Sequence, residues 1–306
     1  MQLILDLARS NGGLITRKLL RGVGIHVGQL ERLARLGAVA RVARGVYAVA
    51  AVTASATPWI VTRAHDVVLS RLSAAAWWGV DLPKAPVLMH VTASRNRGRR
   101  KDAIDGVRLH RADLRPHHVL WHRGVRVTSP LRTALDIARH ESLEEAVAIV
   151  DAFFRARLLR YDDFQQAAAL SAGPGRLRIQ TVASLVDPDS GSILESLARV
   201  LLWRNGMLPP ESQYPLVHPA TGWRGRLDFA WPELCVALEC DGYEWHAGRD
   251  AFQGDRRRWS TLNRMDWKSG VVTWFDVTAD PFYVVGLVAD LLGRPMPRRI
   301  QHANAA

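Results

Sequence analysis

Cysteine, acidic residues and long apolar runs are all scarce in this chain of 306 residues. Only two cysteines are present, Cys235 and Cys240, and their odd spacing along an expected strand disfavours a disulfide between them. No stretch approaches the ~20 consecutive apolar residues that a membrane-spanning helix needs. The N-terminus lacks the basic, apolar and small-residue regions of a signal peptide. We therefore expect a cytoplasmic protein in a reducing compartment, with no membrane partner.

The shortage of acidic residues leaves a strongly basic chain. Lysine and arginine number 41 against 29 aspartates and glutamates, which gives a formal net charge of +12. A preference for arginine over lysine explains which cation is used, but not why cations outnumber carboxylates. The excess favours a polyanionic partner such as nucleic acid. The length and the 48% hydrophobic content allow two or three separate cores.

Residues 1–50 show the pattern of a small DNA-binding domain. Helical spacing of apolar residues predicts a first helix through Leu3 and Leu7, a short one over Arg17–Arg21, and another over His26–Leu36. Two short strands then flank Arg44-Gly45. Helix, helix, turn, helix and hairpin is the order of a winged helix, so we expect a winged-helix domain here.

In a winged helix the last helix enters the major groove of double-stranded DNA and the hairpin reaches phosphates. The expected helix offers polar side chains for base edges, and the hairpin offers arginines. The candidate DNA-binding residues are His26, Gln29, Arg32 and Arg35 on the helix, and Arg41 and Arg44 on the hairpin. Winged helices also contact proteins, so protein binding is the alternative; the local basic excess favours DNA.

Residues 61–170 read as a middle α+β domain, between expected linkers at 51–60 and 171–190. Val67–Leu69 and Leu72–Trp78 suit a helix, and short strands are expected near Val91, Leu109 and Val125. Two amphipathic helices should follow, over 131–138 and 143–156. The arginine-rich stretch 95–101 is either a solvated loop or a phosphate-binding loop.

Residues 190–295 form the last expected domain, and carboxylates lie on its predicted strands. Asp228 falls in one strand, while Glu239 and Asp241, two residues apart in the next, face the same side. Grouped carboxylates repel one another unless a cation or protons lie among them. Mg²⁺ or Mn²⁺ prefers such hard oxygen ligands and assists phosphodiester hydrolysis. We therefore predict that Asp228, Glu239 and Asp241 bind a metal ion.

Residues 1–160 resemble a known family through several short motifs. These are Gly13-Leu14-Ile15-Thr16, Arg41-Val42-Ala43-Arg44-Gly45-Val46-Tyr47, Ser73-Ala74-Ala75-Ala76 and Val127-Thr128-Ser129-Pro130. They resemble AbiEi-type antitoxins. The resemblance implies a transcriptional autorepressor of a type IV toxin–antitoxin pair, with a cognate toxin or another protein as partner. It does not imply that this chain is itself an antitoxin, because the module also occurs fused to other domains.

Residues 190–290 resemble a second family. Asp228-Phe229, Glu239, Asp241-Gly242 and Trp245-His246 are similar to the PD-(D/E)XK nucleases, above all to very-short-patch-repair endonucleases. The likeness implies a restriction-endonuclease-like α/β fold, with a central mixed sheet flanked by helices. It implies a catalytic set with these roles: Asp228 and Glu239 as metal ligands, His246 as general base or acid, and Glu195 orienting a water. Arg258 either pairs with Asp255 or grips a phosphate.

One departure from this pattern bears on catalysis. The lysine usually found two residues after the second acid is Asp241 here, which cannot stabilise a developing negative charge. The sequence thus predicts a multidomain α+β protein and leaves three functions open. The first hypothesis is a Mg²⁺-dependent DNA endonuclease. The second is a non-catalytic antitoxin-type regulator with a degenerate nuclease fold, and the third is an adaptor that acts through the middle domain. RNA in place of DNA also stays open.

Overall fold

The computed structural model describes most of the chain: residues 2–9, 14–26, 28–43, 46–49, 57–95, 106–207, 210–242, 260–297 and 299–300. None of the helices in these ranges combines the length and the apolar character that crossing a membrane requires. The chain divides into two compact units, one of residues 1–79 and 84–133, the other of residues 80–83 and 134–306.

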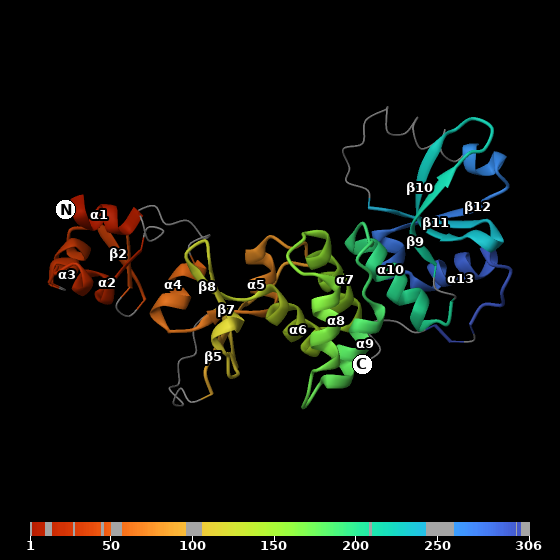
Figure 1. The fold of residues 1–306 in the computed structure, drawn as a ribbon. Helices are drawn as coiled ribbons and strands as arrows, with labels where there is room; N and C mark the ends of the chain where they lie inside the picture. Colours follow the sequence, from red (N-terminus) through yellow and green to blue (C-terminus); the bar gives the residue numbers. More distant parts are fainter. Residues whose placement is uncertain are drawn as a thin grey trace. The chain divides into compact units, whose positions relative to one another are not determined.

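The N-terminal segment builds helices around a small antiparallel sheet with strand order β1-β3-β2 (Figure 1). Its elements are α1 (Gln2–Arg9), β1 (Leu14–Thr16), α2 (Arg17–Gly22), α3 (Gly28–Arg35), β2 (Val39–Ala43) and β3 (Val46–Val49). Thr16 caps α2, because its Oγ1 accepts a hydrogen bond from the backbone N–H of Leu19 at 3.1 Å. The expected helices and hairpin are confirmed, and β1 is an addition to the prediction.

The rest of the first unit is a mixed sheet with strand order β6-β5-β4-β8-β7. Its elements are α4 (Thr57–Ala64), β4 (Val68–Leu69), α5 (Arg71–Trp78), β5 (Met89–Ala93), β6 (Val107–Arg111), a 3₁₀ turn (Pro116–His118), β7 (Val119–His122) and β8 (Val125–Thr128). Leu69, Val91 and Val127 form part of its apolar core. Both tryptophans of α5 are tied to the sheet, since Nε1 of Trp77 and of Trp78 donates to a strand carbonyl oxygen.

Helices lead into the second unit: α6 (Pro130–His140), α7 (Leu143–Arg155), α8 (Tyr161–Ala169), α9 (Arg176–Leu185) and α10 (Ile193–Arg204). Ser142 caps α7 through a 3.2 Å hydrogen bond from the N–H of Glu145. α7 then packs against α10, where Arg204 pairs with the buried Glu144. α7 and α10 therefore belong to one folded body.

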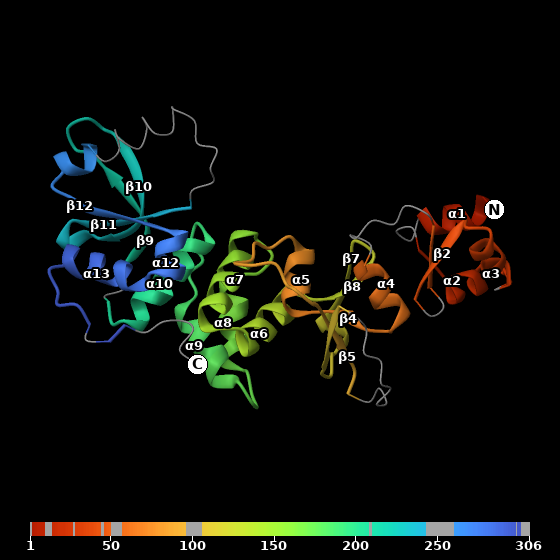
Figure 2. The same cartoon turned by 180° about the vertical axis from the view of Figure 1, so that it is seen from behind.

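A four-stranded sheet completes the second unit in the order β12-β11-β10-β9. Its elements are β9 (Glu211–Val217), β10 (Arg224–Trp231), a 3₁₀ turn (Pro232–Leu234), β11 (Val236–Asp241), β12 (Lys268–Thr273), α12 (Trp274–Ala279) and α13 (Pro281–Leu291). β9, β10 and β11 are antiparallel, whereas β11 and β12 are parallel. Both views show α10, α12 and α13 on one side of this sheet (Figures 1 and 2).

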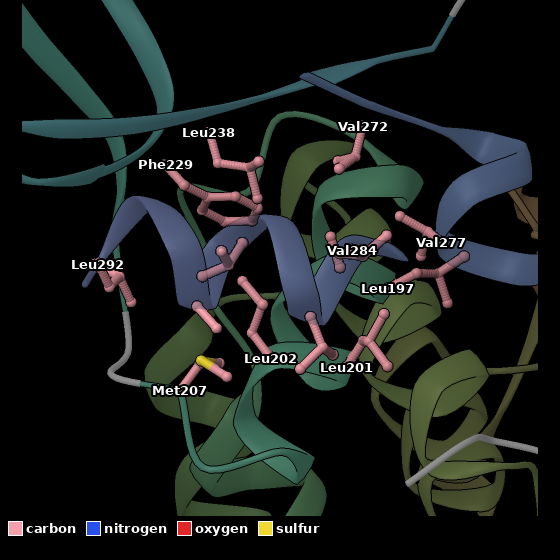
Figure 3. Close-up of a cluster of buried hydrophobic side chains, with 14 of the residues drawn as sticks. Leu197, Leu201, Leu202, Met207, Phe229, Leu238, Val272, Val277, Val284 and Leu292 are labelled. Atoms are coloured by element: carbon pink, nitrogen blue, oxygen red, sulfur yellow. The ribbon is translucent and has the colours of Figure 1, made fainter. Parts of the chain in front are cut away.

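The main core of this unit lies between that sheet face and the helices. Phe229, Leu238 and Val272 point from the strands toward Leu202 of α10 and Val284 of α13 (Figure 3). Alternate strand residues face the opposite side and form a smaller cluster around Trp267. The expected alternation is confirmed for β11, where Val236 and Leu238 belong to the main core and Ala237 to the smaller cluster. β10 departs from it, because Leu227 lies in the smaller cluster and Phe229 in the main core.

Several expectations about linkers and short elements are wrong. The stretch 51–60 was expected to be a linker, but α4 begins inside it, and α9 occupies much of 171–190. Val68 and Leu69 form strand β4 and pair with Thr92 and Val91, because Asp66 and Arg71 turn the backbone with positive φ on either side. Short apolar runs carry no periodicity that separates helix from strand.

The division into compact units falls near residue 133, inside the range 61–170 that the sequence assigns to a middle domain. The reason is the packing of α7 on α10, which joins the second half of that range to the C-terminal sheet. The boundaries 1–50, 61–170 and 190–295 remain a prediction.

Candidate functional site

The first candidate site is the exposed face of α3. Leu30 and Leu33 bury one side of this helix against the N-terminal core. The predicted DNA-binding residues that the structure describes here are all exposed: His26, Gln29, Arg32, Arg35 and Arg41. His26 also orders the start of the helix, because its Nδ1 accepts a hydrogen bond from the N–H of Gly28 at 3.2 Å. Arg44 lies outside the described residues.

The second candidate site begins at α10, where Glu195 lies in the first turn. Ser192 caps this helix through its Oγ, which accepts a hydrogen bond from the N–H of Glu195 at 3.1 Å. The buried Glu195 carboxylate accepts hydrogen bonds from the N–H of Gly191 at 2.7 Å and from Nε2 of Gln213 at 2.8 Å. Burial raises the pKa of Glu195; the Gly191 hydrogen bond opposes that rise, and the charge of Asp228 adds to it.

Asp228 enters the same site from β10. Its Oδ2 accepts a hydrogen bond from the N–H of Cys240 on the neighbouring strand at 2.9 Å. Its Oδ1 accepts a second from Nε2 of Gln213 at 3.3 Å. Gln213 on β9 therefore joins the acid of α10 to the acid of β10, and fixed donors hold both carboxylates.

Glu239 and Asp241 differ in their surroundings, although both lie on β11. Glu239 is buried, whereas Asp241 is exposed at the end of the strand. Burial raises the pKa of the Cys240 thiol, and the charges of Asp228, Glu195 and Glu239 raise it further. Of these acids, Asp228 is the one that contacts the backbone of Cys240, through the hydrogen bond from its N–H.

The predicted metal ligands do not form a ready-made cluster. Within the described part of the chain, no three His, Cys, Asp or Glu side chains lie close enough together to hold a metal ion. The prediction paired Asp228 with Glu239 and Asp241; the hydrogen bonds instead pair Asp228 with Glu195 through Gln213. His246 and Arg258, the predicted base and phosphate-binding residue, lie outside the described residues.

Gln213 is the site residue that the sequence analysis missed. Its backbone φ is 53°, in the left-handed region that non-glycine residues seldom adopt. Regular alternation along β9 gives no sign of such a turn, and an isolated glutamine in a strand carries no catalytic signature. Its contacts arise only from the fold.

The donor set suits a hard divalent cation. Carboxylate and amide oxygens are the ligands that Mg²⁺ and Mn²⁺ take in proteins. Glu195 and Asp228 converge on Nε2 of Gln213, and the buried Oε1 of Gln213 has no hydrogen-bond partner among the described residues. A buried acceptor without a partner is uncommon and calls for an explanation. The residues present therefore fit such an ion by their chemistry.

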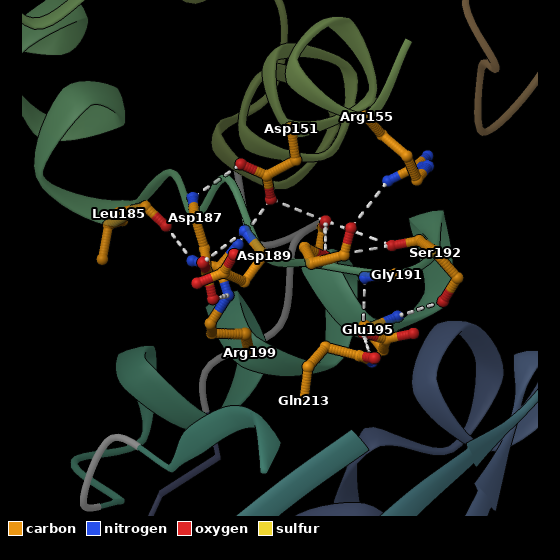
Figure 4. Close-up of polar contacts among 12 residues, drawn as sticks. Asp151, Arg155, Leu185, Asp187, Asp189, Gly191, Ser192, Glu195, Arg199 and Gln213 are labelled. Atoms are coloured by element: carbon orange, nitrogen blue, oxygen red, sulfur yellow. Dashed lines mark hydrogen bonds and ion pairs between the residues drawn. The ribbon is translucent and has the colours of Figure 1, made fainter. Parts of the chain in front are cut away.

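A buried polar network connects this site to α7 (Figure 4). Asp151 of α7 accepts hydrogen bonds from Oγ of Ser196 at 2.6 Å and from the N–H of Asp187 at 2.8 Å, and it pairs with Arg199. Oγ of Ser190 lies 2.9 Å from Oγ of Ser196. The network therefore holds the turn 187–191 in place, and Gly191 at its end donates to Glu195.

Comparisons with known proteins assign the first part of the chain. Residues 2–50 match the family model described as transcriptional regulator, AbiEi antitoxin, and residues 67–186 match the AbiEi antitoxin C-terminal domain. The two models match this chain one after the other, in this order. The expected resemblance to AbiEi antitoxins is confirmed, and the second matched range ends at residue 186.

Similar proteins occur in Mycobacterium tuberculosis. Uncharacterized protein Rv2248 of strain H37Rv and uncharacterized protein MT2308 of strain CDC 1551 / Oshkosh are each 32% identical over 168 residues, which is 55% of this chain and 62% of each relative. The match thus spans less than two thirds of the relatives' length. The crystal structure of RV2827C protein from the same species aligns at 17% identity and a TM-score of 0.35, over 60% of this chain and 80% of that chain.

Proposed function

We propose that this chain is a DNA-binding transcriptional regulator of the AbiEi antitoxin kind, with a cognate toxin as its partner. The observation that carries the proposal is the exposed basic face of α3, which lies within the range matched by the regulator model. A helix that buries two leucines and presents Arg32 and Arg35 to solvent fits the major groove and its phosphates. The net charge of +12 supports a polyanionic partner as well.

The test is binding to double-stranded DNA from the region upstream of its own gene, measured by fluorescence anisotropy at several salt concentrations. Arg32→Ala with Arg35→Ala should weaken binding about tenfold or more and lower the salt slope by about two, since two phosphate or base contacts are lost. The matched control is Arg160→Ala with Arg176→Ala, two exposed arginines of the other compact unit. Equal losses in both double variants would contradict the assignment of α3.

The second candidate function is metal-dependent hydrolysis of DNA phosphodiesters by the C-terminal sheet. One observation favours it: Nε2 of Gln213 joins the carboxylates of Glu195 and Asp228. Asp228 would be the central ligand of Mg²⁺ or Mn²⁺, and Glu195, joined to it through Gln213, would be a second ligand or would orient water. A bound cation would neutralise charge on the phosphate. Asp241 stands where related nucleases have lysine, so the regulator is the better supported function.

Plasmid nicking in Mg²⁺ or Mn²⁺ separates the two functions. A nuclease should nick DNA in the wild type and lose nicking in Asp228→Ala, because the central acid is gone. Nicking that persists in Asp228→Ala would contradict this site. No nicking with either metal, together with tight duplex binding, leaves the regulator as the sole function.

A further inference from the structure

Gln213 lies in a backbone conformation that a side chain makes costly. Its φ of 53° falls in the left-handed region, and it sits between Ser212 and Tyr214, which pair with Phe229 and Leu227. The register leaves Gln213 opposite Asp228 with no strand pair of its own. Strained backbone persists only where surrounding contacts hold it, and such positions gather at functional sites.

The side-chain amide supplies those contacts. Nε2 carries two hydrogens, and it lies 2.8 Å from Oε2 of Glu195 and 3.3 Å from Oδ1 of Asp228. A neutral amide thus lies between two carboxylates and donates to both. Those carboxylates come from α10 and β10, so the bridge also ties the helix to the sheet.

The space around this bridge is tightly filled. A Cβ added at Gly191 would lie 2.9 Å from Nε2 of Gln213 and 2.9 Å from Oε1 of Glu195. The other amide atom, Oε1 of Gln213, is buried and accepts no hydrogen bond from the described residues. The site therefore contains one oxygen that its own side chains leave without a partner.

We propose that Gln213 is the positioning residue of this acid site. Its Nε2 holds Glu195 and Asp228 together in the metal-free protein, and its Oε1 is a further oxygen ligand for the divalent cation. The inference rests on the proposed metal-dependent function, because the cation of that function is what Oε1 of Gln213 would coordinate. An amide serves both states, since it donates to the acids through nitrogen and offers oxygen to a cation.

The test uses the full chain and MnCl₂ titrated by calorimetry, with MgCl₂ titrated by ¹⁵N–¹H spectra. Gln213→Met keeps length and removes both amide functions; we expect about tenfold weaker Mn²⁺ binding, as for other residues that orient metal ligands. The matched control is Gln165→Met, because Gln165 of α8 donates to the carbonyl oxygen of Ala183 and lies in the same unit. It should bind Mn²⁺ like the wild type.

Should Gln213→Met fail to fold, Gln213→Glu takes its place. A third carboxylate at this position should lower the melting temperature without metal and increase the rise that Mn²⁺ produces. Wild-type affinity in Gln213→Met, or an unchanged response to Mn²⁺ in Gln213→Glu, would overturn the role of Gln213.

Failure of the metal site itself is a separate result. If the wild type binds neither Mn²⁺ nor Mg²⁺, the metal-dependent function and the ligand role of Oε1 both fall. The exchange rate of the side-chain amide protons of Gln213 then tests whether Gln213 bridges Glu195 and Asp228. Exchange with water much slower than at the exposed Gln180 supports the bridge, and equal exchange rates overturn it.

Discussion

Among single residues, Asp151 is a buried carboxyl group whose protonation affects the stability of the fold. It is 1% exposed on α7, and burial raises its pKa from 3.8 to about 7, while Arg199, Ser196 and the N–H of Asp187 oppose the rise. The folded protein therefore holds the proton of Asp151 more tightly than the unfolded chain. Its contribution to stability is complete below about pH 4 and is lost as the pH rises through about 7.

Asp151→Asn should remove this pH dependence. From pH 4.5 to 7.5 the wild type should lose about 2 kcal/mol of its free energy of unfolding, whereas the variant should not show this loss. The pKa rise from 3.8 to about 7 sets an upper limit of ~4 kcal/mol on the effect. Urea unfolding across that range measures it. Asp189→Asn, an exposed acid of the same turn, is the control. Parallel curves for wild type and Asp151→Asn would refute the prediction.

Gly191 lies against the acid site with no room for a larger side chain. A Cβ there would lie 2.9 Å from Nε2 of Gln213 and from Oε1 of Glu195, and moving either side chain would disturb the hydrogen bond from Nε2 of Gln213 to Oε2 of Glu195. Gly191→Ala should lower the free energy of unfolding by about 1–3 kcal/mol. Gly242→Ala in the same unit meets nothing within 4 Å and should stay within about 0.5 kcal/mol of the wild type. Equal stability of the two variants in urea unfolding would contradict this packing.

The acids of the site could be predicted from residues alone, but their partners could not. The spacing of Glu239 and Asp241, and the position of Asp228 one strand earlier, follow from alternation. The pairing of Asp228 with Glu195 depends on Gln213, whose φ of 53° breaks that alternation. Strand alternation thus predicts where each acid lies on its strand, whereas the contacts of Gln213 determine that Asp228 pairs with Glu195.

At the level of elements, α10 depends on its N-cap. Ser192 is the side chain that satisfies the N–H of Glu195, and α10 supplies much of the core beneath the sheet. Ser192→Ala should lower the free energy of unfolding by about 1 kcal/mol, whereas Ser192→Thr should retain most of it. Thermal melts of these variants and of Ser184→Ala, an exposed serine of α9, test this. A Ser192→Ala melt like that of Ser184→Ala would contradict the cap.

Elements with strong periodicity or caps were predictable, and those without were not. Helices α7 and α10 follow a serine cap and a buried stripe, so the sequence predicts both. α4 and α9 escape prediction because Pro58 and the run Gly173-Pro174-Gly175 indicate a linker. In both cases the helix begins just after the breaking residues or with proline in its first turn, where proline is tolerated.

At the scale of the whole molecule, the matched antitoxin domain and the compact unit do not share a boundary. The AbiEi C-terminal match ends at residue 186, yet α7 inside it packs on α10 beyond it. Two ion pairs join these helices: Asp151 pairs with Arg199 in the core, and the buried Glu144 pairs with the half-buried Arg204. Removing α7 would leave both arginines without their acids, so we expect α10 to be destabilised without α7.

This argument predicts which fragment folds. A chain of residues 134–306 should unfold cooperatively, because it retains α7 and the core that includes Ala148, Leu194 and Leu201. A chain of residues 190–306, cut at the domain boundary that the sequence suggests, loses α7 and leaves Arg199 and Arg204 without their acids. It should show a broad transition and bind a hydrophobic dye. Equal cooperativity of the two fragments in urea would mean that the C-terminal sheet is stable without α7.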